Sequence, residues 1–214
     1  MKPGQVGMFL RLHYWTLVAP RMAFAALRVI PGGHWYALAA VTVMASAYSI
    51  AVAFMALASV PMDPFPFLAG IKGSVSLGDV FGLVLLTLVT WIAASVTTHL
   101  VSLAMGGRGK FEYLLAMTGV AMAVVGYVTM VAGLTIVALE GMVGYLRWGS
   151  PFAGSPSAFA SPIIMAAIMA ELLWFFMLYS LSARVTHNPE FPKCMYAGLG
   201  GILVHVTLFR YVIA

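Results

Sequence analysis

The sequence predicts an all-α integral membrane protein, a bundle of five transmembrane helices with an amphipathic N-terminal segment. Three observations predict this class. Five long apolar blocks fill most of the 214 residues. Hydrophobic residues make up 63% of the chain and charged residues 8%, whereas a soluble domain is about a quarter charged. Lysine and arginine gather in alternate connections between the blocks, as they do on the cytoplasmic side of membrane proteins.

The five blocks define the predicted spans. A helix needs about 20 apolar residues to cross the hydrocarbon core of a bilayer, and each block is long enough. The spans cover residues 35–60, 80–105, 113–139, 162–183 and 194–212. We therefore expect a five-helix transmembrane domain over 35–214, preceded by a cytoplasmic or interfacial N-terminal segment over 1–34.

The N-terminal segment is predicted to contain a short amphipathic helix. Pro20 divides the segment, and proline suits the first turn of a helix. Arg21 and Arg28 are seven residues apart and therefore share one helix face. Two placements stay open. With Arg11, these arginines are interfacial basic residues above an apolar face that rests on lipid, or the segment docks on the bundle.

The distribution of basic residues predicts the orientation. The positions that would share the cytoplasmic side are Lys2, Arg11, Arg21, Arg28, Arg108, Lys110, Arg184 and Lys193. The other side has only Lys72 and Arg147, with Arg210 near the C-terminus. Because cytoplasmic connections are rich in lysine and arginine, we expect a multi-pass protein of the cytoplasmic (inner) membrane. Its N-terminus is cytoplasmic and, after five crossings, its C-terminus is outside.

Composition and motifs exclude several function classes. The net charge of +5 is not concentrated in a basic run, so nucleic acid is not an expected partner. The single cysteine, Cys194, allows no internal disulfide. No phosphate-binding glycine motif, nucleophile elbow or zinc-protease motif occurs, and we expect a non-enzymatic protein without a cofactor.

The histidines predict neither a metal site nor a haem site. His13, His34 and His187 are expected in loops or at the interface, without metal-ligand spacing. Haem b needs axial imidazoles from facing helices. His99 would lie near the cytoplasmic end of its span and His205 near the middle, and this difference in depth argues against haem.

Small residues form one stripe on the third predicted span. Gly119, Gly126 and Gly133 are seven residues apart, with Ala123 between them. In lipid, small residues let helices approach closely. We interpret this stripe as a helix-packing seam, with a lipid or ligand groove as the alternative.

Glu171 is the most notable single residue, because it interrupts the middle of the fourth span. A carboxylate at this depth costs several kcal/mol unless it is paired or protonated. The connection to the fifth span centres near Asn188, and Glu171 and His205 are equally distant from that centre in sequence. We therefore predict an intramembrane polar pair, Glu171 and His205, as either a structural hydrogen bond or a proton- or cation-linked site.

Two short stretches resemble a known family. They are VAPRMAFAAL at 18–27 and MGGRGKFEYLLAMTG at 105–119. The first is similar to the Pro-x-x-x-Phe motif, and the second to the Gly-Gly-x-Gly-x-Phe turn, of the Yip-domain family of multi-pass membrane proteins. The chain looks most like the prokaryotic members. The resemblance implies five spans with a cytoplasmic N-terminus, and a cytoplasmic turn formed by Gly106, Gly107, Arg108, Gly109 and Lys110.

The sequence leaves two functions open. The first is a non-enzymatic scaffold or accessory subunit that acts through helix–helix contacts in a larger membrane complex, with lipids and membrane protein subunits as partners. The alternative is a small transporter or channel that uses Glu171 and His205. Its best candidates for a polar lining are the hydroxyl residues of the second span, Thr87, Thr90, Ser95, Thr97 and Thr98. Such residues otherwise bond to carbonyls of their own helix.

Overall fold

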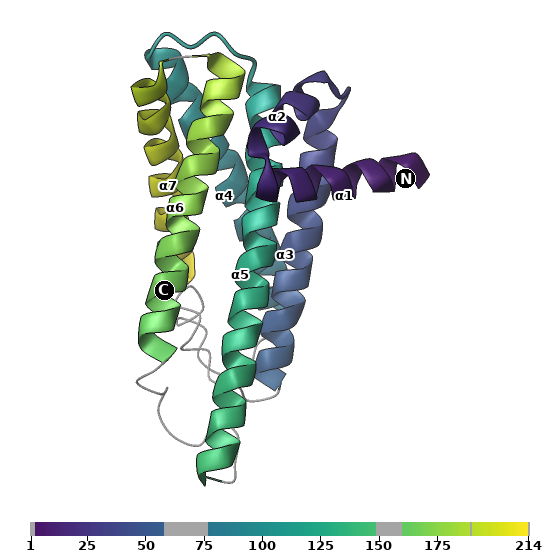
Figure 1. The fold of residues 1–214 in the computed structure, drawn as a ribbon, viewed down its shortest axis with the longest axis vertical. Helices are drawn as coiled ribbons and strands as arrows, with labels where there is room; N and C mark the ends of the chain where they lie inside the picture. The colour runs from purple at the N-terminus through teal and green to yellow at the C-terminus, as the bar shows by residue number, and fades with distance from the viewer. Residues whose placement is uncertain (1–2, 58–76, 149–159, 189, 214) are drawn as a thin grey trace.

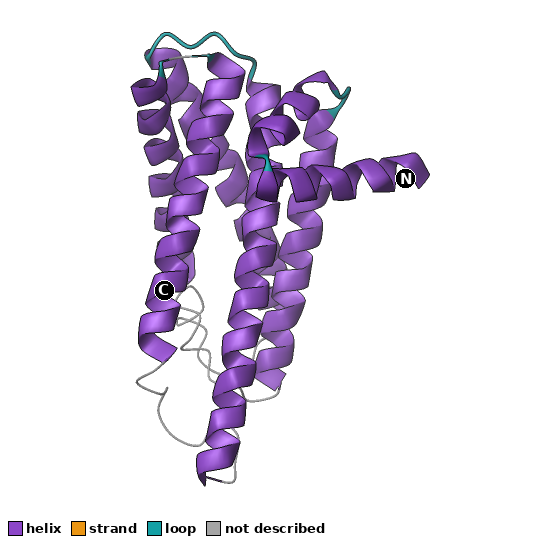
Figure 2. Ribbon diagram, in the orientation of Figure 1, coloured by secondary structure: helices purple, strands orange, loops and turns teal. Residues whose placement is uncertain are grey.

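The structure, a computed structural model, describes residues 3–57, 77–148, 160–188 and 190–213. Every regular element in these ranges is a helix (Figure 2). The helices are α1 (Pro3–Val18), α2 (Pro20–Val29), α3 (Gly33–Leu57), α4 (Leu77–Ala104), α5 (Phe111–Trp148), α6 (Ala160–His187) and α7 (Phe191–Ile213). The all-α prediction is therefore confirmed.

Four helices are long and apolar enough to cross a membrane. The qualifying segments are Gly33–Phe54, Leu77–Ala104, Phe111–Leu139 and Met165–His187. They correspond to the first four predicted spans, and the chain is a helical membrane protein. Among the described residues α7 does not join these four, so a fifth crossing over 194–212 stays a prediction.

The long helices form one bundle (Figure 1). α3 packs mainly on α5, α7 packs on α4 and α6, and α4 contacts each of the other four. The α4–α5 turn, the α6–α7 turn and the α2–α3 connection all lie at the same end of the bundle. Below, this end is called the basic end, because Arg28, Arg108, Lys110, Arg184 and Lys193 lie in or next to these connections.

α1 and α2 pack on the outside of the bundle. α1 runs crosswise to the long helices and projects beyond them (Figure 1). α2 contacts α5, α6 and α3, and it buries Ala23, Phe24 and Leu27 in the protein core. Arg21 and Arg28 are exposed on the opposite face. Of the two placements that the sequence left open, α2 therefore docks on the bundle, with its apolar face on protein rather than on lipid.

The turn between α4 and α5 is packed against the end of α6. Gly106 has a positive φ of +88°, which glycine adopts without strain. A Cβ on Gly107 would lie 2.8 Å from the Cβ of His187, and one on Gly109 would overlap the backbone of Thr186. The glycines of this turn therefore allow close packing on α6 as well as the chain reversal.

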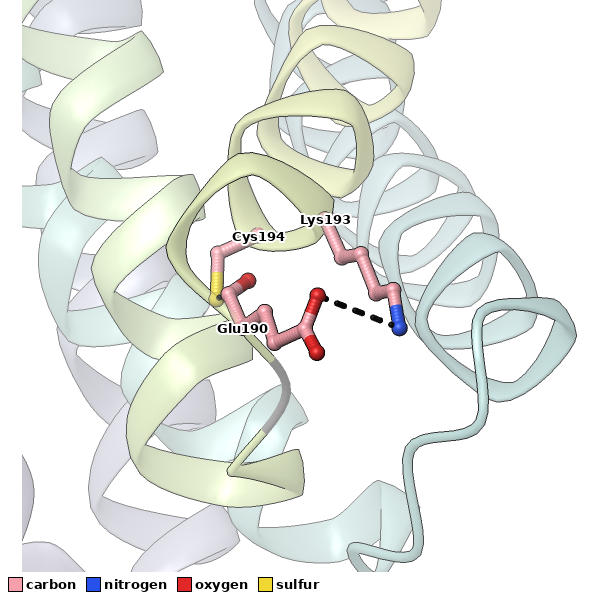
Figure 3. A network of polar contacts seen from close by, with 3 residues as sticks. All are labelled: Glu190, Lys193 and Cys194. Atoms are coloured by element: carbon pink, nitrogen blue, oxygen red, sulfur yellow. Dashed lines mark hydrogen bonds and ion pairs between the residues drawn. The ribbon is translucent and has the colours of Figure 1, made fainter.

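The α6–α7 turn is held by local contacts (Figure 3). Asn188 has a positive φ of 52°, a conformation that asparagine tolerates better than most residues. Lys193 pairs with Glu190 across 3.4 Å. The Cys194 thiol donates a hydrogen bond to the carbonyl of Glu190 at 3.3 Å, and Cys194 is buried.

Candidate functional site

One cavity inside the bundle receives side chains from all five long helices. Its volume is about 60 Å³. The lining residues are Met44 and Tyr48 of α3, Thr87 of α4, Met122, Gly126 and Thr129 of α5, Glu171 and Phe175 of α6, and His205 of α7. The cavity is therefore placed by the packing of the whole bundle rather than by one loop.

Glu171 is the carboxylate of this cavity. Thr129 of α5 donates a side-chain hydrogen bond to it, and Tyr48 of α3 lies close enough to interact with it electrostatically. A hydroxyl donor stabilises a carboxylate that has lost its water. Glu171 thus lies near polar groups from two other helices.

His205 lies on the same cavity as Glu171. The His205 side chain is 7% exposed, and its ring centroid is 4.5 Å from that of Phe175, one turn along α6 from Glu171. Glu171 of α6 and His205 of α7 therefore lie at similar depth in the bundle, as the hairpin register predicts. The structure brings Glu171 and His205 to one cavity, where Thr129 supplies the hydrogen bond to the carboxylate.

The size and charge of the cavity limit what it can hold. A buried water needs roughly 10–15 Å³ of accessible volume, so 60 Å³ accommodates a few waters or one small ion. Neither lysine nor arginine is among the residues that line it. A proton or a small cation is therefore what can balance the charge of Glu171 there.

The hydroxyl groups of α4 mostly bond within their own helix. Thr87, Thr97 and Thr98 each donate to the carbonyl four residues earlier, at 2.8 to 3.0 Å. Ser95 does the same at 2.6 Å and also contacts Thr118 of α5 at 2.7 Å. Of the predicted polar lining, only Thr87 reaches the cavity.

The glycine stripe of α5 faces α3. A Cβ on Gly119 would lie 2.8 Å from the Cβ of Ala37, and one on Gly126 would lie 2.5 Å from the sulfur of Met44. Ala123, between them, is fully buried, whereas Gly133 is only partly buried. The stripe therefore lies against a helix of the same chain over its first two turns.

A pair of histidines at the basic end escaped the sequence analysis. His187, predicted in a loop, is the last residue of α6 and is 5% exposed. Its Nε2 lies 3.0 Å from Nδ1 of His99 in α4. The backbone N–H of Gly109 donates to Nδ1 of His187 at 2.9 Å. These contacts join α4, α6 and the α4–α5 turn.

The contacts of the histidine pair determine its protonation. Because a backbone N–H can only donate, Nδ1 of His187 is an acceptor and its proton sits on Nε2. That proton is donated to Nδ1 of His99, so both imidazoles are neutral. A metal-bound histidine needs one ring nitrogen free for the metal, whereas both ring nitrogens of His187 already take part in these hydrogen bonds. Within the described part of the chain, no three metal-ligating side chains cluster.

The predicted interfacial arginines are exposed, and none lines the cavity that contains Glu171. Arg11 of α1 lies over the Trp15 ring at 5.8 Å. Its neighbour His13 packs on Tyr127 of α5, with ring centroids 5.9 Å apart. Burial lowers the pKa of His13, against a smaller opposing effect of its hydrogen bond to the Phe9 carbonyl. α1 is thus attached to the bundle by a histidine that favours its neutral form.

The predicted cytoplasmic turn is placed beside the histidine pair. Arg108 and Lys110 are exposed, whereas Gly107 is buried. Lys110 Nζ lies 6.0 Å from the centre of the Tyr113 ring at the start of α5.

The chain was compared with models of protein families, with curated proteins and with solved structures, and it matches none of them.

Proposed function

We propose that the protein is a small membrane transporter or channel for protons or a small cation, with the Glu171 cavity as its intramembrane site. The observation that carries this proposal is the convergence of five helices on one cavity that contains a carboxylate, an imidazole, a phenol and two threonine hydroxyls. Ionisable residues inside membrane helices commonly mark ion pathways and proton relays.

The chemistry of the site favours a very small substrate. A volume of about 60 Å³ is far below the roughly 300–1,000 Å³ of pockets for organic ligands. In this conformation the cavity suits a proton shared with water, or one dehydrated cation held by carboxylate and hydroxyl oxygens. Glu171 would carry the charge, with Thr129 and Tyr48 orienting it.

The topology belongs to the same proposal. Five crossings, with α7 as the fifth, would put the basic end and the N-terminus in the cytoplasm and the C-terminus outside the inner membrane. A cavity lined by residues from α3 to α7 would then be reached from either side by rearrangement of the helices. The resemblance to prokaryotic Yip-domain proteins is compatible with this layout and stays a prediction.

Proton and cation flux into proteoliposomes tests the proposal. Purified protein is reconstituted with an internal pH-sensitive dye, a potassium potential is imposed with valinomycin, and uptake of labelled sodium is measured in parallel. We expect flux above that of empty liposomes, and we expect E171Q to reduce it at least tenfold. His205→Ala is expected to reduce it as well.

The matched control is Glu190→Gln. Glu190 is a carboxylate of the same helical hairpin, but its side chain is 75% exposed and it pairs with Lys193 outside the cavity. Flux through this variant should equal that of the unsubstituted protein. Equal flux through E171Q, or no flux above empty liposomes for any ion tested, contradicts the proposal.

An accessory subunit is the second candidate, and the outer face of α6 favours it. Met165, Met169 and Met177 are each more than half exposed there, next to the small residues Ala166 and Ala170. Methionine is common at binding surfaces because its side chain adapts to different partners. Native mass spectrometry of the protein in nanodiscs tests this function. Stoichiometric membrane subunits support it, and a lone monomer or homo-oligomer contradicts it.

A further inference from the structure

A second and larger cavity lies at the basic end of the bundle, away from Glu171. It has a volume of about 310 Å³. The α2–α3 connection forms one wall, and the first turns of α3 and α5 form the other. Its polar lining residues are Arg28, His34, Glu112 and Tyr113. The cavity thus contains one cationic and one anionic side chain, from different helices.

The opposite charges in this cavity do not neutralise each other directly. Arg28 lies in the last turn of α2, Glu112 lies in the first turn of α5, and both side chains are exposed. Among the described residues, neither Arg28 nor Glu112 takes part in an ion pair. The ion pair in that part of the chain joins Glu190 to Lys193, outside this cavity. Two unlike charges that line one cavity without meeting offer separate partners to a ligand that itself carries both signs.

The backbone shapes this cavity through two adjacent glycines. Gly32 has a positive φ of +70°, and a Cβ there would lie 3.3 Å from the Trp35 ring. A Cβ on Gly33 would lie 3.0 Å from the carbonyl of Leu27. The tight connection therefore holds the end of α2 close to the start of α3, with Arg28 facing the cavity across from α5.

The surroundings of the cavity are those of a membrane interface. Trp35 is 65% exposed, and Val29 is 78% exposed. Large apolar side chains beside charged ones are typical of the level of lipid headgroups, where tryptophan is enriched. At the same roughly 10–15 Å³ of accessible volume per water, 310 Å³ holds about twenty to thirty waters, which suits a headgroup rather than a single ion.

We propose that this cavity binds the headgroup of a zwitterionic phospholipid with a primary amine, phosphatidylethanolamine. Arg28 pairs with the phosphate, because guanidinium matches phosphate oxygens geometrically. Glu112 accepts hydrogen bonds from the ammonium. His34 and Tyr113 supply further polar contacts. Phosphatidylglycerol offers no ammonium to Glu112, and the choline headgroup offers a quaternary one that cannot donate a hydrogen bond.

Native mass spectrometry with defined lipids tests the proposal. The delipidated full-length protein is mixed with phosphatidylethanolamine, phosphatidylcholine or phosphatidylglycerol of identical acyl chains, and the occupancy of the first bound lipid is measured. We expect phosphatidylethanolamine to be bound at least fivefold more than either other lipid. Equal occupancy of the three lipids would overturn the assignment.

Two variants separate the roles of the two charges. E112Q is expected to retain phosphate binding and to lose most of the fivefold preference for phosphatidylethanolamine over phosphatidylglycerol. Arg28→Gln is expected to lower occupancy by all three lipids. Both side chains are exposed, so neither change removes a core contact, and size-exclusion chromatography verifies the fold. An unchanged preference in E112Q, or an unchanged occupancy in Arg28→Gln, contradicts the proposal.

Two further arms exclude a general charge effect and identify the source of the headgroup. Lys193→Gln removes another cation of the basic end that does not line the cavity, and it should change nothing. Glycerophosphoethanolamine, which has the same headgroup without acyl chains, is added as a competitor. Weak displacement of bound phosphatidylethanolamine by this competitor supports a membrane lipid as the ligand. Full displacement at equal concentration shows that the headgroup alone is recognised, and it contradicts a membrane lipid as the ligand.

Discussion

At the residue scale, the neutral histidine pair is the most specific polar contact of the basic end. His187 receives the Gly109 amide proton and donates its own proton to His99. A buried amide that loses its acceptor costs about 1–3 kcal/mol, and the Gly109 contact is partly buried. Replacing His187 with alanine should therefore lower the free energy of unfolding by about 1 kcal/mol, the lower end of that range.

His187→Asn is the control for this prediction. An asparagine side-chain oxygen can take the place of Nδ1 and accept from Gly109, although it is too short to reach His99. This variant should recover part of the lost stability. The measurement is thermal or denaturant unfolding in detergent, and an alanine variant as stable as the asparagine variant would show that the Gly109 contact contributes nothing.

Residue-level contacts of this kind were beyond prediction from the sequence. His99 and His187 are 88 positions apart, and their meeting depends on the rotation of α4 and α6 about their axes. The apolar blocks determine where helices lie but say little about that rotation. Glu171 and His205 were easier to relate, because a short turn at Asn188 fixes the relative depth of two antiparallel helices.

At the element scale, the parallel packing of α3 on α5 depends on the glycine stripe. Gly119 faces the Cβ of Ala37 and the Trp91 ring, each 2.8 Å from where a Cβ would lie. Neither neighbour is the end of a flexible chain, so Gly119→Ala should force the helices apart. Overpacking of this kind typically costs about 1–3 kcal/mol.

The same substitution at Gly82 of α4 provides the comparison. No atom lies within 4 Å of a Cβ at Gly82, and alanine favours a helix by about 1 kcal/mol over glycine. Gly82→Ala should therefore leave stability unchanged or raise it, as measured by thermal unfolding in the same detergent. If the two variants unfold alike, close packing at Gly119 does not stabilise the bundle.

The boundaries of the long helices could be predicted, because the length of each apolar block determines them. The placement of α2 could not, because it depends on docking against the bundle. The predicted spans lie within or nearly within α3 to α7, and the split at Pro20 matches the break between α1 and α2. The docking of Phe24 and Leu27 was one of two open placements, because an amphipathic face suits lipid and protein equally well. Only the packed bundle distinguishes the two.

At the scale of the whole molecule, the two cavities lie at different depths in the bundle. The Glu171 cavity is lined by α3 to α7, whereas the larger cavity at the basic end is lined by α2, α3, α5 and their connections. No residue lines both. Ion flux and headgroup binding can therefore be tested separately, and α3 and α5, which contribute to both cavities, connect them structurally.

The number of crossings decides whether the Glu171 cavity is enclosed by spanning helices on all sides. If α7 is the fifth span, the α4–α5 turn and residue 214 lie on opposite sides of the membrane. Cysteine labelling tests this prediction cleanly, since the native Cys194 is 1% exposed and should react little. Lys110→Cys and Ala214→Cys each introduce one new thiol, and its reaction with a membrane-impermeant maleimide reports the side of the membrane on which it lies.

In intact cells, or in spheroplasts if an outer membrane is present, we expect Ala214→Cys to be labelled and Lys110→Cys to be protected until the membrane is permeabilised. This follows because the arginines and lysines of the basic end favour the cytoplasm. The unsubstituted chain reports any reaction of Cys194. Labelling of both variants from the same side would mean that α7 does not cross, and that His205 approaches Glu171 from a helix that returns within the membrane.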